Sequence, residues 1–191
     1  MPLVVHVAAL LAAGGGTRFR GSSHKLLAPL HDRAVWLHAL DHVLAAGFHH
    51  VVVVTGAVQL QPPPPTLLRH NPRWSEGQAT SLQVALEAAR SLGASTVTVG
   101  LADQPFVPES AWQAVRDADP DCRIVVAEYD GRPGPHPVRF AAETWPLLPH
   151  TGDEGARDLL RRHPDWVCRV PCIGSVADID TTEDLDRWKS C

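Results

Sequence analysis

The chain has 191 residues, of which 45% are hydrophobic, and it carries a formal net charge of -4 at pH 7. This length suits one well-buried core and is short for two ordinary domains, so we expect a single domain over residues 1–191. The acidic balance argues against a nucleic-acid partner. No apolar stretch reaches the roughly 20 residues of a membrane span, and no secretory signal pattern is seen, so the sequence predicts a cytoplasmic protein without a membrane partner.

The cysteines and histidines show no spacing typical of a disulfide framework or a zinc site. None of the cysteines forms a CxxC pair, and the eleven histidines form no HExxH or comparable ligand pattern. The sequence therefore predicts reduced thiols. The residues concerned are Cys122, Cys168, Cys172 and Cys191.

Valine-rich apolar runs alternate with helical patterns along the first half of the chain. Residues 3–11 and 50–55 are typical of strands buried on both faces of a parallel sheet. Apolar residues at helical spacing, from Trp36 to Leu44, predict a helix between them that stops at Gly47. The pattern then predicts a proline-rich surface loop over 57–66, a short strand over 66–71, a helix over 77–92 and a strand over 96–101.

The second half continues the alternation. It predicts a helix over 108–118, a strand over 122–128, a proline-broken loop over 131–137, helices near 140–148 and 153–162, a strand over 166–171 and a last helix from 181. The sum is a three-layer α/β/α fold around a mostly parallel sheet, Rossmann-like in its alternation of strands and helices.

A glycine cluster follows the first predicted strand, in the segment LLAAGGGTRFRGSSHKLL at 10–27. Glycines let backbone amides converge on phosphate oxygens, and Arg18 and Lys25 could neutralise further charge. The segment fits neither familiar phosphate-loop pattern, because Gly21 is not followed directly by lysine and Phe19 stands where a dinucleotide loop has its third glycine. A simple turn is the alternative.

Two acidic residues are candidates for a metal site. Asp103 follows the strand at 96–101, at the sheet edge where the glycine loop also lies if the strands are parallel. Mg²⁺ is held by one or two carboxylates together with substrate phosphates, although Asp103 could instead cap the turn at Pro105. Thr181 and Asp184 match a capping box for the last helix, which leaves Asp180 free for a second metal contact.

Six segments resemble, in order, those of molybdenum cofactor cytidylyltransferases, which are nucleotidyltransferases of the glycosyltransferase-A-like fold. They are LAAGGGTRFRGSSHKLLAPL, NPRWSEGQATSL, GLADQPFVP, HPVRF, TGDEGARDLL and DIDTTEDL, and together they span nearly the whole chain. The resemblance implies a nucleotide-binding half over about 1–105 and an acceptor-binding half over about 106–191.

The resemblance also implies roles for single residues. Arg18 and Lys25 would contact the triphosphate, with Asp103 completing the catalytic group, and Asp103 and Asp180 would bind Mg²⁺. The other implied nucleotide contacts are Leu11, Ala12, Ala13, Gly14, Gly15, Gly16, Gly77 and Ser81, and the implied acceptor contacts are His136, Gly152, Asp153, Gly155 and Arg157. Helix initiation is the alternative role for the Gly77 segment, and surface salt-bridging is the alternative for Arg157.

The implied reaction transfers CMP from CTP to the terminal phosphate of molybdopterin or the molybdenum cofactor, with Mg²⁺ and release of pyrophosphate. Leu-Ala-Ala-Gly at 11–14, where related guanylyltransferases have LAGG, favours cytosine as the base of the nucleotide. A molybdenum hydroxylase is the implied recipient of the product. Alternatives are another nucleotide or phosphorylated acceptor, or a non-catalytic cofactor carrier, and Pro135, where the family has glycine before His-Pro, puts the acceptor in question.

Overall fold

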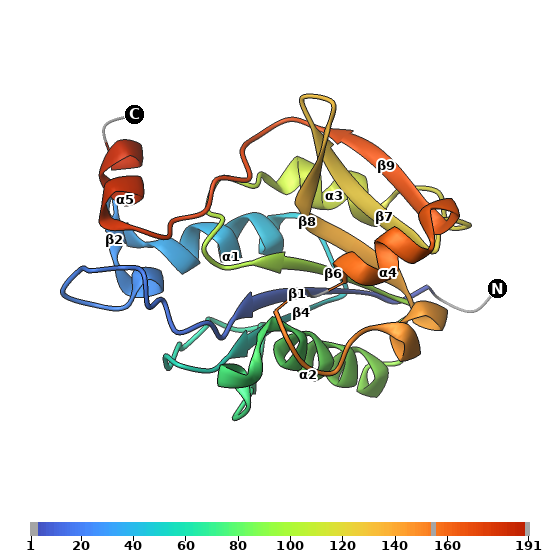
Figure 1. The fold of residues 1–191 in the computed structure, drawn as a ribbon, viewed down its shortest axis with the longest axis horizontal. Helices are drawn as coiled ribbons and strands as arrows, with labels where there is room; N and C mark the ends of the chain where they lie inside the picture. The colour runs from blue at the N-terminus through green and yellow to red at the C-terminus, as the bar shows by residue number, and fades with distance from the viewer. Residues whose placement is uncertain (1–3, 154–155, 190–191) are drawn as a thin grey trace.

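A mostly parallel sheet forms the centre of the computed structural model, which describes residues 4–153 and 156–189 (Figure 1). Its seven strands lie in the order β5-β4-β1-β6-β8-β7-β9. All neighbouring strands are parallel except at β8, which is antiparallel to both β6 and β7, so the predicted sheet type is confirmed. The strands are β1 (His6–Ala12), β4 (His50–Thr55), β5 (Leu67–His70), β6 (Thr96–Leu101), β7 (Ile124–Tyr129), β8 (Arg132–Ala141) and β9 (Val167–Cys172).

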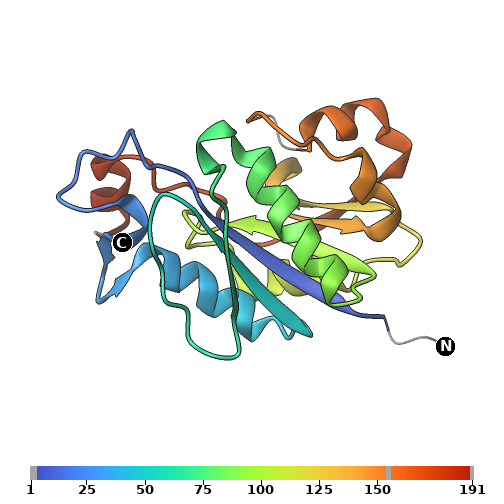
Figure 2. The same ribbon diagram turned by 90° about the horizontal axis from the view of Figure 1, so that it is seen from below.

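Helices cover both faces of the sheet, which gives the predicted three layers (Figures 1 and 2). Side chains alternate across β1, so that Val7 and Ala9 join a core with α2 (Gln78–Ser91), whereas Ala8 and Leu10 join a second core with α1 (Val35–Ala45) and α3 (Glu109–Arg116). The short helix α4 (Arg157–Arg162) and the 3-10 helix η3 (Ala142–Leu147) pack on the α2 face. Within the described residues, no helix has the length and apolar character needed to span a bilayer.

The C-terminal helix α5 (Thr182–Lys189) packs away from the main sheet, beside the hairpin of β2 (Pro29–Leu30) and β3 (Arg33–Ala34) (Figures 1 and 2). Leu30, Ile179 and Leu185 form a small core there, against which Phe19 of the glycine loop also packs. The predicted capping box is confirmed, because Asp184 N donates to Thr181 Oγ1 and Thr181 N donates to Asp184 Oδ2. This packing fixes the chain just before α5 close to the glycine loop.

The prediction of a loop over 131–137 is wrong, because residues 132–141 form β8. Residues 138–140 of β8 pair with both neighbouring strands, whereas Ala141 pairs with β6 and residues 132–133 pair with β7. The three prolines at 133, 135 and 137 lie before that doubly paired part, where a missing amide donor costs few ladder bonds. The helix predicted near 140–148 is 3-10 (η3), and α4 is shorter than the predicted 153–162.

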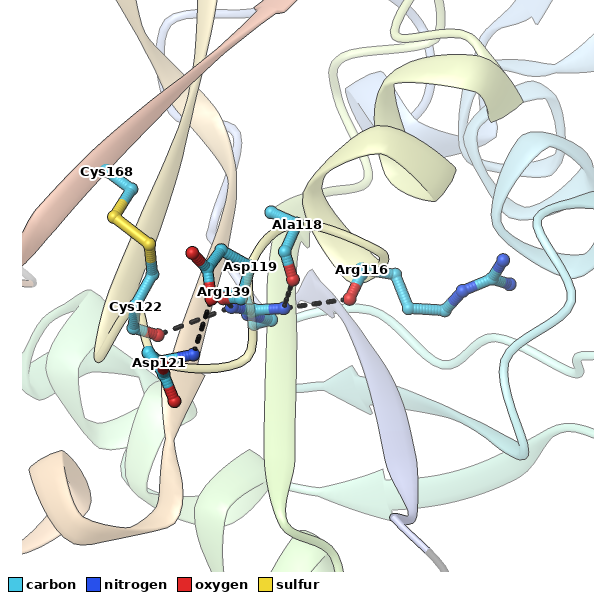
Figure 3. Close-up of a disulfide and its surroundings, with 7 residues drawn as sticks. All are labelled: Arg116, Ala118, Asp119, Asp121, Cys122, Arg139 and Cys168. Carbon is cyan, nitrogen blue, oxygen red and sulfur yellow. Dashed lines mark hydrogen bonds between the residues drawn. A yellow bond between two sulfur atoms is a disulfide. The ribbon is translucent and has the colours of Figure 1, made fainter.

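The prediction of reduced thiols is wrong for two of the cysteines, because Cys122 and Cys168 form a disulfide (Figure 3). Parallel pairing of β7 and β9 sets Cys168 opposite Val125, three residues after Cys122, so neighbouring strands bring the two thiols together. A separation of 46 residues gave the sequence no local signal for this pairing. Cys172 is a free thiol, and Cys191 lies outside the described residues.

Beside the disulfide, Arg139 of β8 organises the connection between α3 and β7 (Figure 3). Its side chain is 2% exposed. The guanidinium donates to the carbonyls of Arg116, Ala118, Asp119 and Cys122 at 2.6 to 3.3 Å. Burial lowers the pKa of Arg139, while the charges of Asp119 and Asp117 and the dipoles of the four carbonyls stabilise its charged form.

We expect Arg139→Met to lower the free energy of unfolding by about 3 kcal/mol, because four backbone carbonyls lose a charged donor. Urea unfolding followed by circular dichroism measures the difference. Arg169→Met is the control, since Arg169 lies exposed on β9, and it should stay within about 0.5 kcal/mol of the parent. An Arg139→Met variant as stable as this control would contradict the structural role.

Candidate functional site

A cavity of about 480 Å³ opens at the carboxyl ends of β1 and β6. In parallel α/β sheets this edge is where ligands bind. The glycine loop after β1 forms one wall, and Gly16 turns the chain with φ of +60°, a conformation that favours glycine. The lining includes Leu11, Ala12, Ala13, Gly14, Gly15, Gly16, Arg18, Lys25, Trp74, Gly77, Ser81, Asp103, Asp153, Arg157, Asp178 and Asp180.

Lys25 joins the two predicted metal ligands in this cavity. Its ammonium lies 2.5 Å from Asp103 Oδ2 and 2.7 Å from Asp180 Oδ1. Asp103 reaches this position because β6 runs parallel to β1, and Asp180 reaches it because Ile179 N donates to the Asp103 carbonyl at 2.9 Å. The two acids are separated by most of the second half of the sequence, and the fold places them around one cation.

The charges around Lys25 stabilise its ammonium form. Burial lowers the pKa of Lys25, but the charges and hydrogen bonds of Asp103 and Asp180 outweigh burial, so the pKa is raised. Arg18 adds a second cation, with its Nη2 2.7 Å from Asp180 Oδ2, although the Arg18 side chain is 75% exposed. Arg18 and Lys25 therefore both contact carboxylates in the structure.

The two acids suit a divalent cation. Asp103 Oδ1 is buried and has no hydrogen-bond partner among the described residues, while Oδ2 contacts Lys25. A buried carboxylate oxygen without a donor is a ready ligand for Mg²⁺ or Mn²⁺, which prefer oxygen ligands. The described residues contain no cluster of three or more His, Cys, Asp or Glu side chains suited to a metal, so water and substrate phosphates would complete the coordination of an ion held by two carboxylates.

A third acid, Asp178, also lines the cavity, and the sequence did not single it out as a ligand. Gln104 Nε2 donates to its Oδ1 at 2.7 Å. Partial desolvation and then the charge of Asp103 raise the pKa of Asp178. The sequence does place Asp178 on the same side of an extended segment as Asp180, because residues two apart share one side, but it predicts only Asp180 as a ligand there. Trp74 is a second lining residue without a predicted role.

The start of α2 forms another wall, and protein groups already occupy its first amides. Gln78 N donates to Asp153 Oδ1 at 3.2 Å, and Ala79 N donates to the Gly152 carbonyl at 3.0 Å. A Cβ on Gly77 would lie 2.5 Å from Gly152 backbone atoms, so this close approach requires glycine. Ser81 is buried and accepts from Asn71 Nδ2 at 2.9 Å. An anion at this helix start would compete with Asp153.

The predicted acceptor residues divide into two groups. Asp153 and Arg157 line the cavity, whereas His136 and Gly152 are not among the lining residues of the described chain. Gly155 lies outside the described residues. The imidazole of His136 is buried, and burial followed by the nearby charge of Arg157 lowers its pKa to about 4. His136 is therefore a buried neighbour of the Arg157 charge and does not line the cavity of the described chain.

The low pKa of His136 predicts that the free energy of unfolding decreases as the pH is lowered. In the unfolded chain the imidazole binds a proton near pH 6.5, whereas in the folded protein it does so only near pH 4. Between these values the unfolded state holds more protons, so the free energy of unfolding should drop by about 3 kcal/mol as pH falls. His136→Asn should remove this part of the pH dependence, measured by denaturant unfolding at pH 7 and pH 4.5.

The matched control for this measurement is His150→Asn, at an exposed histidine. It should retain the pH dependence of the parent protein, because the imidazole of His136 is unchanged in this variant. An identical pH dependence in the parent and in His136→Asn would contradict the burial of a neutral imidazole at this position.

Comparisons with known proteins identify the family of the chain. The model of the MobA-like NTP transferase domain matches residues 8–166. Nicotine blue oxidoreductase from Paenarthrobacter nicotinovorans is 31% identical, covering 98% of this chain and 97% of its own. The purine catabolism protein PucB from Bacillus subtilis is 29% identical, with 94% of each chain covered.

Solved structures share the fold over nearly the whole chain. Rv0371c from Mycobacterium tuberculosis H37Rv is 29% identical, with a TM-score of 0.81 and coverage of 98% of this chain and 99% of its own. A manganese complex of Rv0371c is similar with a TM-score of 0.75, 26% identity and the same coverage. A nucleotidyl transferase from Methanothermobacter thermautotroptrophicus has a TM-score of 0.79 at 21% identity, covering 97% of this chain and 96% of its own, and so shares the fold. With the matched family model spanning most of its length, this chain belongs to the MobA-like NTP transferase family and is a nucleotidyltransferase.

Proposed function

We propose that this enzyme transfers CMP from CTP to the terminal phosphate of molybdopterin or the molybdenum cofactor and releases pyrophosphate. One observation carries the proposal: the ammonium of Lys25 contacts both Asp103 and Asp180 beside the glycine loop. This arrangement offers amide donors and cations for phosphates and carboxylates for a divalent cation, within one cavity.

In the proposed reaction, an oxygen of the acceptor phosphate forms a bond to the α-phosphorus of CTP. The bond from that phosphorus to the bridging oxygen breaks, and pyrophosphate leaves with the electron pair. The nucleophile is already anionic, so the chain needs no general base and works by positioning and charge stabilisation. Arg18 and Lys25 would bind the departing phosphates, while Gly14, Gly15 and Gly16 would bind through their amides.

Asp103 and Asp180 would hold the divalent cation, for which we propose Mg²⁺. When bound, such an ion neutralises charge on the phosphates of the nucleotide and the acceptor. The unpartnered Oδ1 of Asp103 supports this role. The manganese complex of Rv0371c supports a divalent cation in this fold.

The choice of CTP and of a pterin acceptor rests on the resemblance of the motifs. Leu-Ala-Ala-Gly at 11–14 favours cytosine, and Asp153 and Arg157 border the cavity on the side assigned to the acceptor.

We also propose a cytoplasmic location and a molybdenum hydroxylase as recipient. Because disulfides are rare in a reducing cytosol, the Cys122–Cys168 bond should be tested there, by mass spectrometry of alkylated cell extract.

A single assay tests the substrates. The protein is incubated with Mg²⁺, molybdopterin and each of the four NTPs in turn, and pyrophosphate is measured with and without the acceptor. Acceptor-dependent pyrophosphate with CTP above the other nucleotides is the expected result. Preference for GTP or ATP, or turnover only with another phosphorylated acceptor, would instead identify a different nucleotidyltransferase, and binding without turnover would indicate a cofactor carrier.

The name of one relative motivates a second candidate. Nicotine blue oxidoreductase is similar over 98% of this chain, so the assay should also test for a reduction reaction. The loop argues against a nicotinamide enzyme of Rossmann type, because Phe19 replaces the third glycine. Oxidation of a reduced nicotinamide in the presence of nicotine blue, with no pyrophosphate from any NTP, would favour the second candidate.

A further inference from the structure

His24 joins the glycine loop to the turn that carries Lys25. Its Nδ1 accepts a hydrogen bond from Leu26 N at 3.2 Å, which caps the 3-10 helix η1 (Lys25–Leu27). Its Nε2 lies 3.0 Å from the Gly14 carbonyl oxygen. The ring also packs on Gly16, where an added Cβ would lie 3.0 Å from Nε2. One imidazole therefore contacts both parts of the proposed phosphate site.

These two contacts select one form of the ring. A backbone N–H only donates, so Nδ1 must accept from Leu26 and carries no proton. The proton of a neutral imidazole is then on Nε2, where it can be donated to the Gly14 carbonyl. Lysine, arginine or an aliphatic residue could not supply an acceptor and a donor in this way.

The bond to Gly14 fixes the direction of the next amide. In a trans peptide the carbonyl and the following N–H point in opposite directions, so holding the Gly14 carbonyl towards His24 turns the Gly15 N–H away from it. Gly14, Gly15 and Gly16 line the cavity, and His24 is not among the lining residues of the described chain. The imidazole thus holds the loop from outside and directs an amide to the cavity side.

We propose that His24 is a positioning residue that sets the glycine-loop amides and the Lys25 turn for binding the leaving pyrophosphate. It acts through Gly14 and Lys25 and does not itself contact the phosphates. The inference rests on the proposed function only in assigning a polyphosphate to this cavity. It does not depend on which nucleoside or which acceptor the enzyme uses.

Two substitutions separate the loop contact from the cap. In His24→Asn the side-chain oxygen can still cap η1, as asparagine commonly does, but the side chain is too short to reach the Gly14 carbonyl. In His24→Gln the amide nitrogen can reach that carbonyl, but the cap is lost. If His24 had only a structural role, the less stable variant should also be the less active one.

The test measures binding of inorganic pyrophosphate with Mg²⁺ by isothermal titration calorimetry, together with the melting temperature of each variant. We expect His24→Asn to bind pyrophosphate at least about tenfold more weakly than the parent, and His24→Gln to stay within about threefold although its melting temperature is the lower of the two. Equal affinities in the two variants, or a loss of affinity that follows the melting temperature, would overturn the role of His24.

The parent protein distinguishes this inference from the proposed function. If the parent binds pyrophosphate but transfers no nucleotide to molybdopterin, the proposed function fails and the comparison of the two His24 variants still decides the positioning role. If the parent binds no pyrophosphate, the polyphosphate site itself is wrong, and the inference about His24 fails with it.

Discussion

Replacing Asp103 with asparagine is expected to lower nucleotidyl transfer by at least about 100-fold while leaving the fold intact. The substitution removes one of the two charges that converge on Lys25, and with it the carboxylate oxygen that has no hydrogen-bond partner in the described structure. The backbone carbonyl of residue 103 would still accept from Ile179 N, so the placement of the segment before α5 should persist. Acceptor-dependent release of pyrophosphate at saturating Mg²⁺ measures the loss.

The matched control is Asp178→Asn, which removes a carboxylate from the same cavity. Because Gln104 holds Asp178 and no cation contacts it in the described structure, we expect its transfer rate to stay within about tenfold of the parent. An equal loss in both variants would mean that the overall negative charge of the cavity matters, rather than the position of Asp103. Near-normal turnover of Asp103→Asn would contradict a metal-binding role.

The convergence of Asp103 with the glycine loop could be predicted from the sequence for a physical reason. Buried strands of a parallel sheet appear as short valine-rich runs, and their carboxyl ends share one edge, so the sequence predicts that residues just after 6–12 and 96–101 lie at that edge. The structure adds that β1 and β6 are neighbours, which brings the two segments together. The position of Asp180 does not depend on a strand of the sheet. The small core between α5 and the β2–β3 hairpin holds the segment before α5, and so Asp180, beside the cavity. Asp180 was a candidate because it precedes the capping box of the last helix, and the family resemblance implied the same role, but no local pattern predicted its contact with Lys25 beside Asp103.

The elements that sequence reasoning missed depend on contacts between distant segments. The sequence predicted a loop for the first part of β8 because that part contains prolines. The prolines precede the residues that pair with both β6 and β7, and a sequence pattern does not show which residues of a strand pair with two neighbours. Arg139 and the Cys122–Cys168 disulfide act on the α3–β7 connection from other strands (Figure 3). His24 shows the same limit, since its partner Gly14 lies ten residues away across an irregular loop.

Lys25→Met is expected to change the response of the protein to divalent cations as well as to abolish turnover. With the ammonium removed, Asp103 and Asp180 face each other as like charges in a site where their side chains are only 18% and 20% exposed. We expect the variant to lose about 3 kcal/mol of stability without metal, which lowers the melting temperature by about 10 °C. Added Mg²⁺ or Mn²⁺ should restore part of this loss, because the cation replaces the missing charge.

The parent protein should respond less to the same ions, since Lys25 already occupies the position between the carboxylates and a metal must compete with it. Lys189→Met, on the exposed side of α5, is the control and should behave like the parent in both respects. Thermal melts with EDTA, and with millimolar Mg²⁺ or Mn²⁺ in place of EDTA, distinguish these cases without any substrate. If the cations stabilise the parent and Lys25→Met equally, the metal does not bind between Asp103 and Asp180, and the proposed site must be moved.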